Sequence, residues 1–302
     1  MSNASVAQTV FLTLVRSTRE RERARLLIDS IHTFGGDFCD CPIWLFEANP
    51  PKAPCKSLEG ARVQVLPLHV PDTVRRYDFG DKVYACAQAE SSAASVQSLI
   101  WADPAFLFIQ PPLLFDLGVS FDAAVRPVHI RNVGLLATEP LDGFWKKIYE
   151  MVGVQDIQAA VESFVDAQYI RAYFNSHAFA VNPSKGLLRR WFNCFEALVC
   201  DQAFQLTCCQ DERHQVFLHQ AVLSSLIATM LDPQRVRILP PGYNYPYNLH
   251  PSIPPDRRAH SLNDLVSTAY EERQLNPSVM DDIDVHEPLR SWLSAQAGIR
   301  PS

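Results

Sequence analysis

The sequence lacks any long apolar segment that would place it in a membrane. No apolar run approaches the roughly 18–20 residues that a membrane-spanning helix needs. No apolar stretch of the kind found in secretory signals follows Met1. We therefore expect a cytoplasmic protein with no transmembrane segment.

The excess of positive charge that is typical of nucleic-acid-binding proteins is also missing. The chain has 27 Lys and Arg residues against 33 Asp and Glu residues, and hence a formal net charge of −6. This balance argues against a binder whose whole surface is basic. We expect no nucleic-acid partner.

Cysteine patterns that bind zinc are absent too. None of the eight cysteines forms a C-x-x-C pair, and the close pairs have no histidines at zinc-type spacing. Without an export signal, we expect reduced thiols that pack as small hydrophobic side chains. The cysteines are Cys39, Cys41, Cys55, Cys86, Cys194, Cys200, Cys208 and Cys209.

Internal repeats and low-complexity tracts are likewise missing, which argues against a repeat architecture. The 302 residues suffice for one large domain or two small ones. A hydrophobic content of 47% with 20% charged residues is typical of a globular protein with a sizeable core.

Strand-like and helical segments alternate in the first third of the chain. The β-branched stretch 9–15 predicts a strand, and apolar residues at helical spacing predict a helix over 19–34. Strands are expected over 42–47 and 63–68, with a Pro-rich loop over 49–54. A parallel, doubly wound α/β sheet begins in this order.

The segment 98–112, SLIWADPAFLFIQPP, is the centre of the predicted fold. Its apolar start indicates a strand buried on both faces, and Pro104 forces that strand to end at Asp103. Open α/β sheets bind ligands at the carboxyl ends of their strands, so Asp103 is a candidate site residue. The alternative is an Asp that only caps a turn before a proline.

A second candidate lies at the start of a helix predicted from about Gly80 or Asp81. Lys82 in its first turn can meet a phosphate, because the free backbone N–H groups of a helix start already favour an anion. The alternative is a solvated cap with a local ion pair.

The second half of the chain continues the alternation of segments. A helical hairpin, or a strand and a helix, is expected over 157–172, and the tail from 251 is expected to form an arm on the core. We therefore predict a main domain over 1–250 and a C-terminal arm over 251–302. Helices are expected over 141–152, 185–199 and 213–231, and a late strand over 236–239.

In their order, these features resemble the GT-A-fold glycosyltransferases, the nucleotide-diphospho-sugar transferase superfamily. The resemblance extends from about residue 9 to residue 250. It rests on the turn at 101–105, the Phe-Asn-Ser trio at 174–176, the helix start at Asp211 and the Tyr-Asn stretch that ends at His250. It implies a single α/β, GT-A-like (Rossmann-like) domain with a mixed, mostly parallel central sheet flanked by helices.

The resemblance also implies a divalent metal. In that superfamily the central turn carries Asp-x-Asp, whose acids hold a metal that binds the donor diphosphate. Here Asp103 matches the first acid, but Ala105 stands at the second position. This implies a weakened Mn²⁺ or Mg²⁺ site at Asp103 and His250. Otherwise cations such as Arg16, Lys82 or Arg171 stabilise the leaving group, or transferase activity has been lost.

Further roles follow from the same resemblance. His177 would narrow the sugar pocket or add an acid–base group, whereas His219 fits a packed, hydrogen-bonded histidine. Asp211 and Glu212 would be the catalytic carboxylates beside the transferred sugar, with helix capping as the alternative reading. The cofactor-binding residues would be Arg16 and Ser17 beside the nucleotide, Lys82 at the phosphates, and Asn175 and Ser176 at the sugar.

The expected function is transfer of a sugar from a nucleotide-diphospho-sugar donor to an acceptor that is a glycan, a protein or a small molecule. The alternative is an inactive nucleotide-sugar-binding or scaffolding protein that has lost the second metal-binding acid at Ala105.

Overall fold

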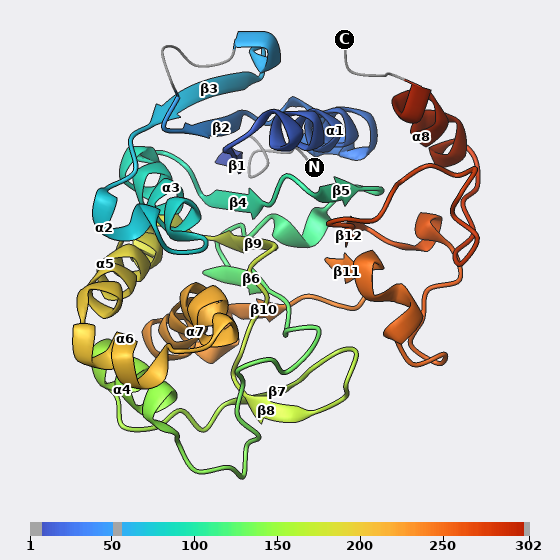
Figure 1. Ribbon diagram of the computed structural model, residues 1–302. Coiled ribbons are helices and arrows are strands. Elements are labelled where there is room, and N and C mark those ends of the chain that lie inside the picture. Colours follow the sequence, from blue (N-terminus) through green and yellow to red (C-terminus); the bar gives the residue numbers. More distant parts are fainter. Residues whose placement is uncertain (1–7, 51–55, 299–302) are drawn as a thin grey trace.

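A seven-stranded sheet forms the centre of the molecule (Figure 1). The computed structural model describes residues 8–50 and 56–298. The strands of this sheet are β1 (Thr9–Val15), β2 (Ile43–Ala48), β3 (Val63–Leu68), β4 (Ser98–Ala102), β6 (Ala123–Val125), β9 (Ala178–Val181) and β10 (Val236–Ile238).

The strands follow the order β10-β6-β9-β4-β1-β2-β3. β9 runs antiparallel to both of its neighbours, whereas the other neighbouring pairs are parallel. The predicted α/β fold with a mixed, mostly parallel sheet is confirmed. The reversed direction of β9 matters for the site, because it brings the start of β9 beside the carboxyl end of β4.

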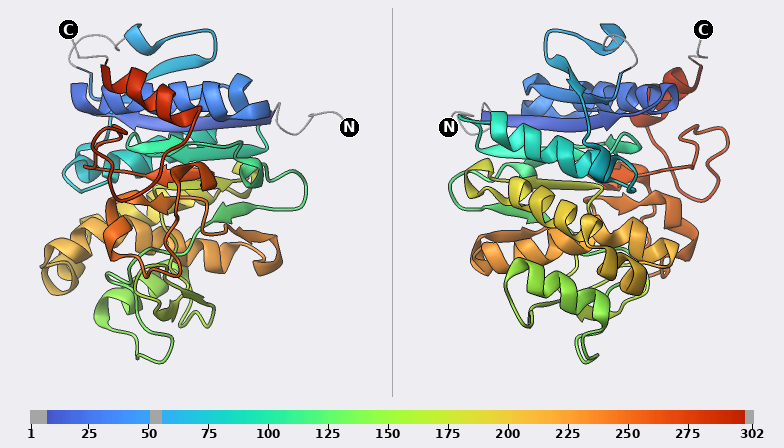
Figure 2. Two further views of the ribbon diagram at one scale, coloured as in Figure 1. Left: turned by 90° about the vertical axis from the view of Figure 1, so that its right-hand side faces the viewer. Right: turned by 60° about the vertical axis from the view of Figure 1, so that its left-hand side comes forward.

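Helices cover both faces of the sheet (Figure 2). On one face Phe11 of β1 packs with Leu27 of α1 (Thr18–Phe34). On the other face Trp101 of β4 packs with Val83 of α3 (Gly80–Ser92) and Leu223 of α7 (Glu212–Met230). The remaining α-helices of the described residues are α2 (Asp72–Arg75), α4 (Gly143–Val152), α5 (Leu187–Cys200), α6 (Gln202–Cys208) and α8 (Leu289–Gly298).

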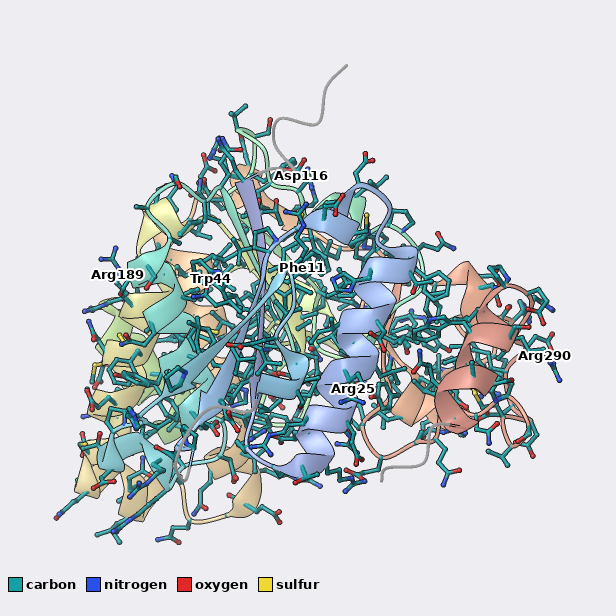
Figure 3. All side chains as sticks on the ribbon, turned by 90° about the horizontal axis from the view of Figure 1, so that it is seen from above. Phe11, Arg25, Trp44, Asp116, Arg189 and Arg290 are labelled. Atoms are coloured by element: carbon teal, nitrogen blue, oxygen red, sulfur yellow. The ribbon has the colours of Figure 1, made fainter. Side chains whose placement is uncertain are left out.

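The layers are plain when the molecule is seen from above (Figure 3). Arg189 on α5 lies on one side of the sheet, α1 with Arg25 lies on the other, and α8 with Arg290 lies beyond α1. In the part of the chain that the structure describes, no helix is long and apolar enough to cross a membrane.

The C-terminal residues add a strand to a second, smaller sheet. In it β12 (Ser267–Ala269) pairs antiparallel with β5 (Phe106–Phe108) and parallel with β11 (Tyr245–Pro246). The tail thereby reaches the strand that directly follows Asp103. The division at residue 250 stays a prediction.

Most predicted elements occur where they were expected. The strands over 9–15 and 63–68 have these same bounds, and α3 begins at Gly80. The prediction of a helix within 157–172 is wrong, because β7 (Ala160–Glu162) and β8 (Tyr169–Arg171) form a β-hairpin there. Ile170 is buried and bridges Leu136, a long-range pairing that local periodicity does not reveal. Residues 51–54 of the predicted loop lie outside the described residues.

Candidate active site

The carboxyl end of β4 and the start of β9 lie side by side at one edge of the sheet. Ala102 pairs with Ala178 across these antiparallel strands. One residue further on, the amide nitrogen of Asp103 donates to the carbonyl oxygen of His177 at 2.9 Å. Pro104 has no amide hydrogen, so the ladder cannot continue beyond this point. The backbone therefore sets Asp103 opposite His177.

Three donors hold the Asp103 carboxylate. Lys82 Nζ and Trp101 Nε1 donate to its Oδ1 at 2.9 and 2.7 Å. His177 Nδ1 lies 2.9 Å from the Oδ2 atom. Hydrogen bonds between charged groups are stronger than neutral ones. Both carboxylate oxygens are thus engaged within the protein.

The protonation states of Asp103 and His177 follow from this pairing. Burial raises the pKa of Asp103, but Lys82 and His177 outweigh it and hold that pKa well below its usual value. Burial lowers the pKa of His177, but its bonds to Asp103 and Glu271 raise the pKa to about 9. At neutral pH the site therefore contains an ionised carboxylate and a charged imidazolium.

Glu271 completes a chain of alternating charges. Its Oε1 lies 3.2 Å from His177 Nε2, so the imidazolium stands between two carboxylates. The Glu271 side chain is 42% exposed and that of His177 is 27% exposed, whereas Lys82 is 2% exposed. We call Lys82, Asp103, His177 and Glu271 the Asp103 cluster. Its solvent-facing side is formed by His177 and Glu271.

Lys82 occupies the buried end of the Asp103 cluster. Its Nζ also donates to the carbonyl oxygen and the Oγ of Ser176 at 2.6 and 3.4 Å. It lies 5.6 Å from the ring centre of Phe79 and 5.2 Å from that of Trp101. An ammonium group has three donors, and these contacts use all of them. Lys82 thus holds Asp103, and it does not face the open phosphate position that the sequence predicted.

Of the six described residues other than glycine with a positive backbone φ angle, three lie at or near this cluster. Two of them are Phe79 (60°), which contacts Lys82, and Glu271 (46°), which contacts His177. Asn244 (50°) is a third case, and its side chain bonds Asn175. Left-handed backbone at residues other than glycine costs energy and concentrates at functional sites. Two members or neighbours of the Asp103 cluster, Phe79 and Glu271, thus have left-handed backbone that residues other than glycine rarely adopt.

Asn175 and Ser176 lie behind the cluster and support it. Asn175 Oδ1 accepts from the amide nitrogen of His177 at 2.7 Å and from Asn244 Nδ2 at 2.8 Å. Ser176 Oγ lies 3.0 Å from His219 Nε2, while His219 Nδ1 lies 2.8 Å from the Val216 carbonyl oxygen. Burial lowers the pKa of His219 to about 3, so its ring is neutral, Nδ1 donates to the carbonyl and Nε2 accepts from Ser176. His219 is therefore packed and hydrogen-bonded, as the sequence indicated.

Arg16 and Ser17 follow β1 at the carboxyl-terminal edge of the sheet. Arg16 Nε lies 3.5 Å from Asp81 Oδ2, and its Nη2 lies 2.9 Å from Glu20 Oε1. Ser17 Oγ caps α1 by accepting from the Glu20 amide nitrogen at 3.2 Å. Asp81 and Lys82 lie in the first turn of α3, so Arg16 contacts the same helix start that supplies Lys82 to the Asp103 cluster. Its side chain is 41% exposed.

The structure does not bring three of the predicted residues to this cluster. Asp211 caps α7 by accepting from the His214 amide nitrogen, and both Asp211 and Glu212 are exposed. They lie about two helical turns before His219, which bonds Ser176 behind the cluster. His250 is buried, with Nδ1 2.7 Å from the Tyr245 hydroxyl and Nε2 2.8 Å from the Asp282 carbonyl oxygen.

The residues present do not fit the divalent metal that the resemblance implied. Asp103 has both oxygens engaged, Ala105 offers no carboxylate, and both ring nitrogens of His250 are hydrogen-bonded. Within residues 8–50 and 56–298, no three His, Cys, Asp or Glu side chains are grouped as metal ligands. Lys82 and His177 supply the positive charge beside Asp103 instead.

Sequence reasoning missed Glu271, because nothing local marks it. It lies in a tail with no recognisable motif, and it reaches His177 only because β12 pairs with β5. Trp101 was noted only as part of an apolar strand, yet its indole N–H bonds Asp103.

The fold is that of the GT-A-type glycosyltransferases. The profile of the Rhodobacterales glycosyltransferase domain matches residues 11–230. The match spans well over half of the chain, so the chain belongs to this family.

A solved structure shares the fold. An active-site mutant of LgtC superposes with a TM-score of 0.54 over 96% of this chain and 95% of that chain, at 13% sequence identity. No curated protein matches the sequence.

Proposed function

We propose that this glycosyltransferase takes its sugar from a nucleotide-diphospho-sugar and that the Asp103 cluster is its donor site. The observation that carries the proposal is a carboxylate bonded to a lysine and an imidazolium at the carboxyl end of a central strand. Open α/β sheets bind ligands at this edge.

The leaving group of such a donor is a charged nucleotide diphosphate, which needs positive charge close by. Arg16 is a partly exposed cation, so we assign it to contact the diphosphate. Both ring nitrogens of His177 already bond Asp103 and Glu271, so we assign His177 to attract the diphosphate through its positive charge. Lys82 and Asp103 are positioning residues, because Asp103 bonds the His177 ring and Lys82 holds Asp103 in place. Ser17 lies beside Arg16 on the nucleotide side, and Ser176 supports Lys82 from behind.

An acceptor hydroxyl must lose its proton during transfer. Glu271 is the more exposed carboxylate of the cluster, so we assign it the role of receiving that proton or of orienting the hydroxyl group. This role replaces the one that the resemblance implied for Asp211, which caps α7, and for Glu212, which lies in its first turn. The proposal makes the C-terminal arm part of the working site.

A thermal-shift panel tests the donor assignment. We expect one of UDP, GDP and dTDP to raise the melting temperature, since a ligand that binds only the folded state stabilises it. CMP, which carries a single phosphate, should raise it less. The shift should be equal with Mn²⁺ and with EDTA, because the residues around Asp103 do not fit a metal. No shift with any nucleotide contradicts the donor site, and a shift that requires Mn²⁺ contradicts the metal-free arrangement.

A second candidate function is binding without catalysis, and Ala105 favours it. The two are separated by release of the nucleotide diphosphate from the donor identified by the panel. An enzyme releases it, and Asp103→Ala abolishes the release. His177→Gln is a second test if Asp103→Ala fails to fold. A protein that binds the donor but releases nothing is the binding protein.

A further inference from the structure

A cavity of about 520 Å³ lies apart from the Asp103 cluster, and none of the cluster residues lines it. Its walls come from the carboxyl ends of β6 and β10, from the β7–β8 hairpin and from residues 256–257. Small-molecule sites typically have volumes of roughly 300–1,000 Å³. The cavity thus has room for a sugar.

Arg126 is a buried cation on the wall of this cavity. Its Nη1 donates to the carbonyl oxygens of Pro240, Pro241 and Tyr243 at 3.2, 2.6 and 2.6 Å. The guanidinium stands 4.4 Å from the ring centre of Phe164, which also lines the cavity. Burial lowers the pKa of Arg126 to about 9, so it keeps its charge at neutral pH. Among the described residues, no carboxylate pairs with it.

The other charges on the wall are arranged differently. Arg257 forms an ion pair with Glu162. Asp256 also lines the cavity, but it makes no ion pair with Arg126 in the described part of the chain. A ligand therefore meets two guanidiniums and two carboxylates, of which Arg257 and Glu162 already pair with each other. This combination favours a ligand with a single negative charge and several hydroxyl groups, since a second negative charge would meet the acids.

The cavity is linked to the Asp103 cluster through one backbone contact. The carbonyl oxygen of Arg126 accepts from the amide nitrogen of Asn175 at 2.8 Å. Asn175 Oδ1 in turn accepts from the amide nitrogen of His177. A ligand held at Arg126 would thus lie beside the edge of the sheet where the cluster stands.

We propose that this cavity binds the carboxylate of an acidic sugar through Arg126, with the ring of Phe164 behind the guanidinium. Its role as the acceptor subsite rests on the proposed function, whereas the binding itself does not. A carboxylate matches the fork of a guanidinium and balances its one charge.

NMR titration of the full-length protein with D-glucuronate, D-glucose and D-glucose 6-phosphate tests the proposal. Glucuronate should bind at least roughly tenfold more tightly than glucose, because a charge-assisted bond is gained. It should also bind more tightly than the phosphate ester. Equal affinity for glucuronate and glucose overturns the site, and tighter binding of the phosphate overturns the choice of a carboxylate.

Variants locate the effect at the cavity. Arg126→Gln should abolish the preference for glucuronate over glucose. Because Arg126 also holds three carbonyl groups, a second pair of variants keeps the test independent of folding. Ile238 lines the cavity and is 50% exposed, so Ile238→Glu and Ile238→Lys should both fold. The first should weaken glucuronate binding by roughly fivefold and the second should not weaken it. Equal effects overturn the proposal.

The nucleotide panel separates the two proposals. Ile238→Glu should leave the thermal shift by the nucleotide unchanged, because Ile238 does not contact the Asp103 cluster. If glucuronate binds while no nucleotide does, the donor-site proposal is contradicted and the cavity assignment is supported. If a nucleotide binds while glucuronate does not, the cavity assignment falls alone.

Discussion

Two polar sites, the Asp103 cluster and the cavity beside Arg126, lie near one edge of the sheet. They differ in whether their buried cation has a carboxylate partner. In the Asp103 cluster each charged group contacts a group of opposite sign. In the cavity, Arg126 contacts carbonyl oxygens and an aromatic ring, and no carboxylate of the described residues balances its charge.

This difference separates a preorganised site from a receptive one. Breaking a buried ion pair is costly, because removing one partner leaves the other charge without a partner in a low dielectric. A buried guanidinium without an acid still gains from an incoming anion. The comparison therefore predicts large stability effects in the cluster and ligand-dependent effects at the cavity.

The largest effect is expected from Lys82→Met. The substitution leaves the Asp103 carboxylate without its buried ammonium partner, which costs about 3–5 kcal/mol of unfolding free energy. Urea denaturation measures it. Lys147→Met is the control, because Lys147 pairs with Asp201 at the surface and should change stability little. A Lys82→Met cost as small as that of the control contradicts the paired character of the cluster.

Arg126→Met should cost less than Lys82→Met. It removes a charge that has no acid partner, but it leaves carbonyl groups without a donor, which costs about 1–3 kcal/mol. The same denaturation experiment applies. If Arg126→Met proves the more damaging change, the contrast between the two sites is wrong.

The pH dependence of stability sharpens the contrast within the cluster. The folded pKa of His177 is about 9, above its ordinary value of 6.5. Its contribution is therefore complete below pH 6.5 and is lost as the pH rises through about 9. We expect this loss to be on the order of 1 kcal/mol, discounted for partial exposure of the ring.

Comparison with His177→Gln isolates this contribution. The variant should lack the part of the fall in stability between pH 6.5 and 9 that His177 causes. Identical pH profiles for the two proteins would show that His177 is not held as a cation.

The smallest effect is expected from Glu271→Gln. This carboxylate is 42% exposed, and Asp103 still bonds His177 after the change. The pKa of His177, followed by NMR titration, should fall from about 9 and stay above 6.5. Unfolding free energy should barely change. A fall to 6.5 would mean that Asp103 contributes nothing to the charge of His177.

The sequence revealed the parts of the site that depend on local pattern. The apolar run and Pro104 predicted the strand that ends at Asp103. The position of Lys82 in a helix start marked it as a candidate site residue. The direct contact between Lys82 and Asp103 could not be predicted, because it depends on how α3 packs against β4. The roles expected of Asp211 and His250 illustrate the same limit. A sequence does not distinguish a helix cap such as Asp211, or a buried ring such as His250, from a residue that binds substrate.

The central claim is that the positive charge of His177 helps to hold the diphosphate of a nucleotide donor. Calorimetric titration of UDP, GDP and dTDP into the natural protein, His177→Gln and Lys147→Gln tests it most directly. We predict that one nucleotide binds the natural protein and Lys147→Gln equally, and binds His177→Gln at least roughly tenfold more weakly. Binding of no nucleotide, or equal binding to His177→Gln, would contradict the account.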